Sequence, residues 1–302
     1  EPKAKYRIKN WAKYNAGLIA RGDVTMWIDE EMRTAPAAQT SKRGRPLVYS
    51  DALIQGLLGL KQVLRLPLRA LQGFAGSLRK LAFPDLPVPY YTTLSRRAQT
   101  LKVVLPMQHP NEPLHLVIDS TGLKVYGEGE WKVRKHGWSK RRTWRKIHLA
   151  MDANTGQVCA ALMTHQDVGD AQVLPDLLDQ IPADVPIETV GGDGAYDTKS
   201  CHAQIDARGA TASIPPRPGH RCRLGGRSRQ YAIANSTRRE WKLASRYHRR
   251  SLAETLMYRL KVLTGSSLWG RTVGSQATEV SIRVGILNCM AALARPQSVR
   301  IA

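Results

Sequence analysis

Four residues in the last third of the chain have a spacing that could do chemistry on an anionic substrate. Tyr247, Arg250, Glu254 and Lys261 lie at offsets of 0, 3, 7 and 14 residues. On an α-helix, where each residue turns the chain by about 100°, these offsets fall within roughly 60° of one another. One helix face would then present a carboxylate beside two cations and a phenol, which suits a phosphate-bearing substrate with a metal ion.

The other side of the same segment is apolar. Leu252, Leu256, Leu260 and Leu263 gather there, and this predicts a seam that packs against a core. The same pattern also fits a solvated amphipathic helix with charge pairs four residues apart. The spacing alone leaves both interpretations open.

Two aspartates each follow a predicted strand. Asp119 comes after the apolar run 115–118 and precedes Ser-Thr-Gly, and Asp193 follows the strand predicted over 187–192. The end of a strand is where a sheet delivers side chains to a site. Taken singly, each aspartate also fits an ordinary cap or turn. With Glu254 they place three carboxylates on rigid elements, and packed together these need a cation because like charges repel.

Magnesium is the cation that we expect at such a cluster. It prefers oxygen ligands and is usually held by one or two carboxylates, with water and substrate phosphate completing its shell. Two ions about 3.5–4 Å apart can stabilise both the attacking and the leaving oxygen of a phosphoryl displacement. Zinc is disfavoured because no His/Cys cluster has ligand spacing. The chain has neither a Walker loop nor a Gly-x-Ser-x-Gly elbow, which argues against a nucleotide hydrolase and an esterase.

The composition favours a polyanionic partner. The chain has 46 Lys and Arg against 24 Asp and Glu, a net charge of +22, and such a field attracts polyanions. Membrane surfaces and RNA also attract basic proteins, so the charge alone does not select the partner. No apolar run reaches the about 18 residues that span a bilayer. The four cysteines have no paired spacing, so we expect a reduced, cytoplasmic setting and no membrane partner.

Two strongly basic segments flank the acids. Residues 132–146 contain eight Lys and Arg and no acid, and residues 217–250 contain eleven against Glu240 alone. A charge run is often only a solvated face, but uncompensated cations beside the acids favour nucleic acid. From the first segment and a predicted helix near residue 95, we expect DNA contacts by Lys132, Arg134, Lys135, Arg141, Arg142, Arg145, Lys146, Arg96 and Arg97. The candidates for stacking on an unpaired base are Trp138, Trp144 and Trp241.

The elements that would position these residues divide into three regions. Residues 1–46 are predicted to be an N-terminal segment and linker, with a short helical stretch over 11–31. Residues 47–110 form a helical region, with helices predicted over 52–64, 68–81 and 91–104. Three short helices with tight turns resemble a helix-turn-helix DNA-binding arrangement, although three-helix packing also serves other purposes.

Residues 111–302 have a different pattern. Strands are predicted over 115–118, 147–152 and 157–164, and strands over 187–192 and 211–215 then alternate with helices over 170–181 and 198–207. Further helix is predicted within 265–295. This order of elements predicts an α/β domain with a mixed sheet and C-terminal helices.

With these elements assigned, the chain resembles bacterial insertion-sequence transposases of the DDE type. The resemblance covers nearly the whole chain and is weakest over residues 1–45. It is carried by the spacing Tyr-(2)-Arg-(3)-Glu-(6)-Lys from Tyr247, by the acidic blocks 115–133, 144–152 and 193–197, and by Gly44-Arg-Pro and Tyr49-Ser-Asp51.

The resemblance implies a ribonuclease H-like catalytic fold with a metal-binding triad at Asp119, Asp193 and Glu254. The cofactor would be Mg²⁺, with Mn²⁺ as a substitute, in the form of two ions. Tyr247, Arg250 and Lys261 would grip the phosphates of the transposon end.

The implied activity is cleavage of double-stranded DNA at the terminal inverted repeats, followed by joining of the freed 3′-OH to target DNA. Pairing two DNA ends implies a homo-oligomer, and the setting would be a bacterial cytoplasm, in association with the nucleoid. Two alternatives stay open from the residues. One is a catalytically inactive or repurposed DNA-binding relative, and the other is a structure-selective nuclease of the same fold.

Overall fold

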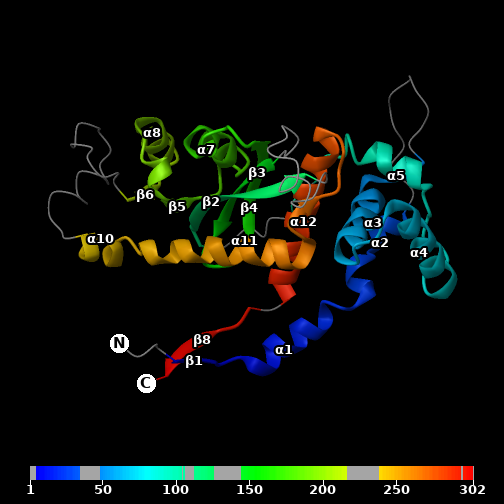
Figure 1. Cartoon of the computed structure of the whole chain (residues 1–302). Coiled ribbons are helices and arrows are strands. Elements are labelled where there is room, and N and C mark those ends of the chain that lie inside the picture. The colour runs from blue at the N-terminus through cyan, green and yellow to red at the C-terminus, as the bar shows by residue number, and fades with distance from the viewer. Residues whose placement is uncertain are drawn as a thin grey trace, which may run out of the picture. The chain divides into compact units, whose positions relative to one another are not determined.

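The computed structural model describes residues 5–34, 48–103, 105, 112–125, 144–215, 238–293 and 295–301. The chain forms two compact units (Figure 1). Unit 1 comprises Glu1–Val104 with Gly285–Ala302, and unit 2 comprises Leu105–Val284. Residues 285–302 belong to unit 1, whereas the sequence analysis grouped them with 111–302, and those domain boundaries stay a prediction. None of the helices in the described parts of the chain is long and apolar enough to cross a membrane.

Unit 1 is mainly helical. Its elements are β1 (Lys5–Ile8), α1 (Trp11–Ala20), η1 (Val24–Trp27), α2 (Glu30–Arg33), α3 (Asp51–Val63), α4 (Leu68–Leu81), α5 (Tyr91–Arg97) and β8 (Ser298–Ile301), together with the end of α12 (Val273–Leu293). The two strands at the ends of the chain pair in antiparallel fashion. The sequence analysis did not predict this pairing.

The three helices expected in the N-terminal region are present. Ser50 caps α3 by accepting a 3.1 Å hydrogen bond from the amide of Leu53. The side chain of Gln72 accepts a hydrogen bond from the amide of Tyr91 and so fixes the start of α5. That helix ends at Arg97, well before the predicted end at 104. After it, the amides of Gln99 and Thr100 bond to carbonyls three residues earlier, as in a 3₁₀ turn. The helix-turn-helix assignment stays a prediction.

Unit 2 contains the mixed sheet that the sequence predicted. Its elements are β2 (Leu114–Val125), β3 (Trp144–Asp152), β4 (Val158–His165), α7 (Asp170–Asp179), β5 (Ile187–Gly191), η2 (Gly194–Tyr196), α8 (Lys199–Ala207), β6 (Thr211–Ser213), α10 (Arg238–Ala244), η3 (Tyr247–Arg250), α11 (Ser251–Thr264), β7 (Ser267–Leu268) and most of α12. The strand order is β4-β3-β2-β5-β6, and β7 also pairs with β2. β4, β3 and β2 are antiparallel neighbours, while β2, β5 and β6 are parallel.

The sheet has a helix-covered hydrophobic face. Leu116 and Ile118 of β2 are buried in one core with Leu174 and Leu177 of α7 and Ile205 of α8. Figure 1 shows α7 and α8 on one side of the sheet and α11 on the other. Successive residues of a strand point to opposite faces. Asp119 therefore points away from the α7 face, whereas Ser120 points toward it.

The strand that carries Asp119 is longer than predicted. The sequence placed Asp119 after a strand over 115–118, but β2 continues to Val125. Asp119 pairs with Leu149, and the ladder with β3 runs on to Lys124 opposite Trp144. Pairing with β3 thus overrides the turn-like Asp-Ser-Thr-Gly sequence, because strand formation depends strongly on its neighbours.

The helix expected from Tyr247 to Lys261 is in fact two elements. Tyr247–Arg250 forms the 3₁₀ helix η3, and the α-helix α11 begins at Ser251. Arg246 has a left-handed backbone with a φ of 51°, and the Arg249 amide bonds to its carbonyl across three residues. The α-helical turn of about 100° per residue therefore applies only from Ser251 onward. On α11, Glu254 and Lys261 still lie two turns apart on one face.

A buried ion pair on α12 holds β7 in place. Arg283 is fully buried, pairs with Glu279 at 2.6 Å and donates to the carbonyls of Gly265 and Ser267 at 2.9 and 2.6 Å. Glu279 in turn accepts hydrogen bonds from the amides of Trp269 and Gly270 at 2.9 and 2.8 Å. These contacts satisfy the backbone on both sides of the short strand β7, which then pairs with the end of β2.

Candidate active site

Asp119 is more enclosed than Glu254, the acid on the helix. Its side chain keeps 19% of its surface exposed, and its Oδ1 accepts a 2.8 Å hydrogen bond from the amide of Ser120. Burial raises the pKa of Asp119, the Ser120 amide and Arg250 lower it, and the charges of Asp193 and Glu254 raise it further. Asp193 and Glu254 therefore lie close enough for their charges to act on Asp119.

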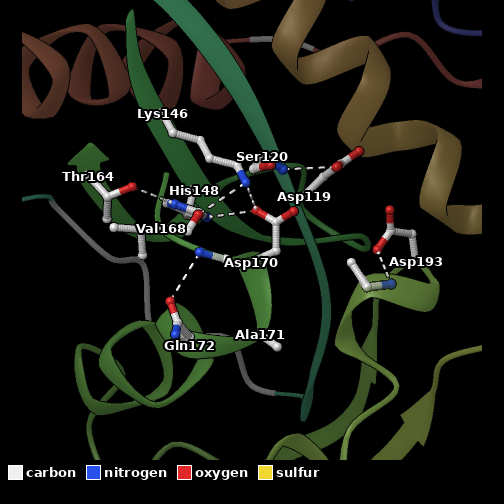
Figure 2. A network of polar contacts seen from close by, with 12 residues as sticks. Asp119, Ser120, Lys146, His148, Thr164, Val168, Asp170, Ala171, Gln172 and Asp193 are labelled. Carbon is white, nitrogen blue, oxygen red and sulfur yellow. Dashed lines mark hydrogen bonds and ion pairs between the residues drawn. The ribbon is translucent and has the colours of Figure 1, made fainter. Parts of the chain in front are cut away.

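Asp193 follows the strand beside β2. The last parallel pair between the two strands is Val117 with Gly191, so Asp119 and Asp193 each lie two residues beyond it. The Oδ1 atom of Asp193 accepts a 2.8 Å hydrogen bond from the amide of Ala195 and so caps η2. Gly192 permits this turn, since a Cβ there would lie 2.8 Å from the ring of Tyr196. Figure 2 shows Asp193 near Asp119.

Arg250 joins the acid of the sheet to the acid of the helix. Its Nη1 lies 3.2 Å from Oδ2 of Asp119, and its Nη2 lies 2.5 Å from Oε1 of Glu254. The Arg250 side chain is 25% exposed and that of Glu254 is 58% exposed. A planar guanidinium can serve two carboxylates through separate nitrogens. This arrangement neutralises part of the charge of the acid cluster.

The acids do not form a closed ligand set as they stand. Within the described residues, no group of three or more His, Cys, Asp or Glu side chains is placed so that it could hold a metal ion. The guanidinium of Arg250 is the cation that contacts both Asp119 and Glu254. The sequence analysis expected the three acids to share divalent ions and did not foresee this ion pair.

A second polar network lies at the start of α7 (Figure 2). Oδ1 of Asp170 lies 2.8 Å from Nζ of Lys146 and 3.3 Å from Nδ1 of the fully buried His148. Burial raises the pKa of Asp170, but hydrogen bonds from His148, Lys146 and Ser120 outweigh it and hold that pKa well below its usual range. The His148 ring also contacts the Thr164 hydroxyl at 2.9 Å. This network braces β2 and β3 on the face opposite to Asp119.

Tyr196 is a buried residue that the charges of both networks affect. It is 2% exposed, and its hydroxyl has no hydrogen-bond partner among the residues that the structure describes. Burial raises the pKa of Tyr196, and the charges of Asp170, Asp119 and Asp193 raise it further. Sequence reasoning missed Asp170 and Tyr196. The only available signal for Tyr196 was its place in the Asp-Gly-Ala-Tyr-Asp block.

Several residues predicted to contact DNA have partners inside the protein. Arg145 donates to the side chain of Gln276 at 2.8 Å, and Lys146 pairs with Asp170. In unit 1, Arg97 pairs with Asp51 and donates to the carbonyl of Tyr49, whereas Arg96 is exposed. The remaining predicted contacts and one predicted stacking residue lie outside the described residues, namely Lys132, Arg134, Lys135, Arg141, Arg142 and Trp138.

The two described tryptophans proposed for base stacking are packed against the protein. Trp241 is buried, with its ring centroid 5.5 Å from that of Tyr247. Trp144 is half-buried, and Nζ of Lys124 lies 5.6 Å from its ring centroid. Trp241 therefore offers no open ring face to a base in this structure, contrary to the sequence interpretation. Trp144 offers at most part of its ring.

A cavity of about 370 Å³ adjoins Arg250. Residues of β2, β5 and β6 line one part of it, and Arg246, Tyr247, Arg249 and Arg250 line another. Nε2 of His115 lies 3.2 Å from Oε2 of Glu188 in its wall. Three arginines from one short segment give this side of the site a positive edge that suits phosphate groups.

Comparisons with known proteins place these features in context. A family model described as "Transposase DDE domain" matches residues 110–289, and a second model with the same description matches residues 19–128. Among solved structures, the chain is similar to one described as a piggyBac transposase synaptic complex with hairpin DNA. The identity is 8%, the coverage is 96% of this chain and 78% of that chain, and the TM-score is 0.40. That likeness is too weak to identify the fold.

Proposed function

The chain belongs to the family of transposases with a DDE domain, and we propose that it cleaves DNA at the ends of an insertion sequence and joins them to target DNA. The observation that carries the proposal is that Arg250 contacts both Asp119 and Glu254, while the charge of Asp193 also acts on Asp119. Three carboxylates in a protein of net charge +22 hinder the binding of a polyanion, so a purely DNA-binding role does not account for them.

A ribonuclease H-like fold for unit 2 is part of this proposal. The sheet order β4-β3-β2-β5-β6, with three antiparallel strands followed by two parallel ones, supports it. Asp119 on the central strand and Asp193 after its parallel neighbour then come from adjacent strands, and Glu254 comes from a helix packed on the same sheet. Unit 1 would contribute the helix-turn-helix-like DNA contacts, in which the exposed Arg96 would take part.

The donor atoms fit a hard divalent cation. Asp119, Asp193 and Glu254 offer only carboxylate oxygens, which are the ligands that Mg²⁺ and Mn²⁺ prefer. The rise in the pKa of Asp119 caused by burial and by the other two acids indicates a site that needs added positive charge. These residues would hold two such ions. When bound, the ions would activate the attacking oxygen and stabilise the leaving oxygen.

The chain's own cations would position the DNA. Arg250 and Lys261 lie on either side of Glu254 in the sequence and would contact backbone phosphates, and Tyr247, at the start of η3, would join them. In cleavage, a water oxygen bonds to phosphorus and the 3′ oxygen leaves as a hydroxyl. In strand transfer, that 3′-OH bonds to a target phosphorus and displaces the target's own 3′ oxygen. Two DNA ends processed together would require a homo-oligomer, working at the bacterial nucleoid.

The test compares cleavage with binding. Asp119→Asn, Asp193→Asn and Glu254→Gln should each abolish cleavage of a duplex carrying the element's terminal inverted repeat, while binding of that duplex persists. Thr255→Ala, an exposed change beside Glu254 on α11, serves as the matched control and should retain cleavage. Cleavage that survives any of the three acid substitutions contradicts the proposal. A strand-transfer assay with target DNA separates a transposase from a nuclease that only cuts.

A further inference from the structure

Arg250 occupies a place that the proposed metal ions also need. Its two terminal nitrogens contact Oδ2 of Asp119 at 3.2 Å and Oε1 of Glu254 at 2.5 Å. Both oxygens belong to carboxylates that would hold a divalent ion under the proposed function. An arginine stays charged at all relevant pH values, so it cannot vacate the acids by losing a proton. The side chain must move if a metal ion is to take both oxygens.

A DNA phosphate offers Arg250 an equivalent partner. Phosphate and carboxylate both present oxygens that match the planar fork of a guanidinium. The guanidinium also has a direction in which to move, because Arg250 lines the cavity that Arg246 and Arg249 border. Arg250 is the last residue of η3 and directly precedes α11, so its side chain can turn without unwinding that helix.

Asp119 would keep its place during such a movement. Its Oδ1 is held by the amide of Ser120 at 2.8 Å, while only Oδ2 contacts Arg250. Departure of the guanidinium therefore frees one oxygen of an already oriented carboxylate. Glu254 is 58% exposed and can adjust. The contacts are arranged so that one side chain can leave while the acid of the sheet stays fixed.

We propose that Arg250 is a positioning residue that exchanges between the acid pair Asp119/Glu254 and a DNA phosphate, so that DNA binding opens the acids to divalent ions. This inference rests on the proposed function. Coupling between two ligands is reciprocal, so DNA strengthens ion binding by the factor by which the ion strengthens DNA binding. Without DNA, the guanidinium competes with the ion and lowers its affinity.

The experiment measures Mn²⁺ binding in the absence of DNA, from the electron paramagnetic resonance signal of the free ion. We expect Arg250→Gln to bind Mn²⁺ at least about five-fold more tightly than the wild type, at the lower end of common coupling factors. Arg249→Gln is the matched control. It removes the same charge one residue away, from a side chain that pairs with Asn154 at 2.5 Å and not with the acids.

A second arm adds an inverted-repeat duplex, with a DNA-only blank subtracted. The duplex should tighten Mn²⁺ binding by the wild type and do so much less for Arg250→Gln, whose acids are already open. Equal Mn²⁺ affinities for Arg250→Gln and Arg249→Gln overturn the inference. If Arg250→Gln does not fold, Arg250→Lys carries the test, because one ammonium cannot span both carboxylates with separate nitrogens. Wild-type Mn²⁺ affinity in Arg250→Lys then overturns the inference.

The proposed function fails by a different result. Asp119→Asn removes one carboxylate charge and should weaken Mn²⁺ binding both with and without DNA. If Asp119→Asn binds Mn²⁺ as the wild type does, the metal site itself is misplaced. If it binds more weakly while the two arginine variants behave alike, the metal site stands and only the role of Arg250 is wrong.

Discussion

The carboxylate of Asp170 meets the ammonium of Lys146 at 2.8 Å, on the face of the sheet opposite to Asp119. Both side chains are largely covered, with 20% and 23% of their surfaces exposed. Ser120, the neighbour of Asp119 along β2, also bonds to Asp170. The strand that presents the proposed catalytic acid is thus anchored from behind by a charged network.

Replacing Asp170 by Asn should destabilise unit 2 in a pH-dependent way. The folded pKa of Asp170 lies below its unfolded value, so its charged form stabilises the fold. At pH 7 the loss should be about 1.5–3 kcal/mol, the range for hydrogen bonds to charged groups. The difference in free energy of unfolding between variant and wild type should shrink as the pH falls below about 4. Urea unfolding at pH 7 and below that pH measures it. A loss that does not vary with pH would contradict this account.

The buried hydroxyl of Tyr196 predicts an unusual response to its removal. Among the described residues it has no hydrogen-bond partner, so Tyr196→Phe should raise the free energy of unfolding by about 1 kcal/mol. Tyr196→Leu, which also removes ring packing, should lower it. Both are measured by thermal and urea unfolding. Destabilisation by Tyr196→Phe would mean that the hydroxyl binds a water or ion among Asp119, Asp170 and Asp193.

Lys261 should contribute to the salt dependence of DNA binding. Under the proposed function it contacts one phosphate, so Lys261→Ala should reduce the slope of log affinity against log salt by about 0.9. Lys146→Met is the contrasting variant, because the charge of Lys146 is already offset by Asp170, and its slope should stay at the wild-type value. Fluorescence anisotropy over a series of salt concentrations measures both. An unchanged slope in Lys261→Ala would remove its phosphate contact.

The ion pair of α12 should be costly to break from one side. Glu279→Gln leaves the fully buried Arg283 without its carboxylate, and such changes cost roughly 3–5 kcal/mol. Arg283 keeps its bonds to two carbonyls, so the lower end of that range is expected. Urea unfolding measures the effect. The control is Ser281→Ala, which removes only an exposed hydrogen bond to the carbonyl of Ala277 on the same helix. Equal stability of the two variants would show that the pair is dispensable.

Local sequence patterns predicted most of the sheet and its helices. β3 and β4 lie on either side of the turn Asn154-Thr-Gly156, and β5 ends just before Asp193-Gly194, so these turn signals placed the strands from sequence alone. The extension of β2 past Ile118 was missed because Asp-Ser-Thr-Gly resembles a turn. Its strand conformation comes from the ladder with β3. The pairing of β1 with β8 joins the two ends of the chain, and no local signal marks it.

The sequence predicted the acidic residues of the site but not the ion pairs that they form. Residue types and the family resemblance drew attention to Asp119, Asp193 and Glu254. The contact of Arg250 with Asp119 spans 131 positions, and a helix-spacing argument placed Arg250 beside Glu254 only. The same argument assumed an α-helix from Tyr247, whereas a 3₁₀ segment changes where Tyr247 and Arg250 point. Asp170 was missed because its partners, Ser120 on β2 and Lys146 and His148 on β3, lie far from it in the sequence.

The continuous ladder between β2 and β3 affects how this part of the protein opens locally. Nine consecutive residues of β2, Leu116–Lys124, have partners on β3, and a ladder of that length opens cooperatively. Amide protons on this strand should exchange with deuterated solvent far more slowly than those of the three-residue strand β6. Asp119 is therefore attached to a backbone whose amides exchange slowly. Side chains around it can rearrange while its carboxylate keeps its position.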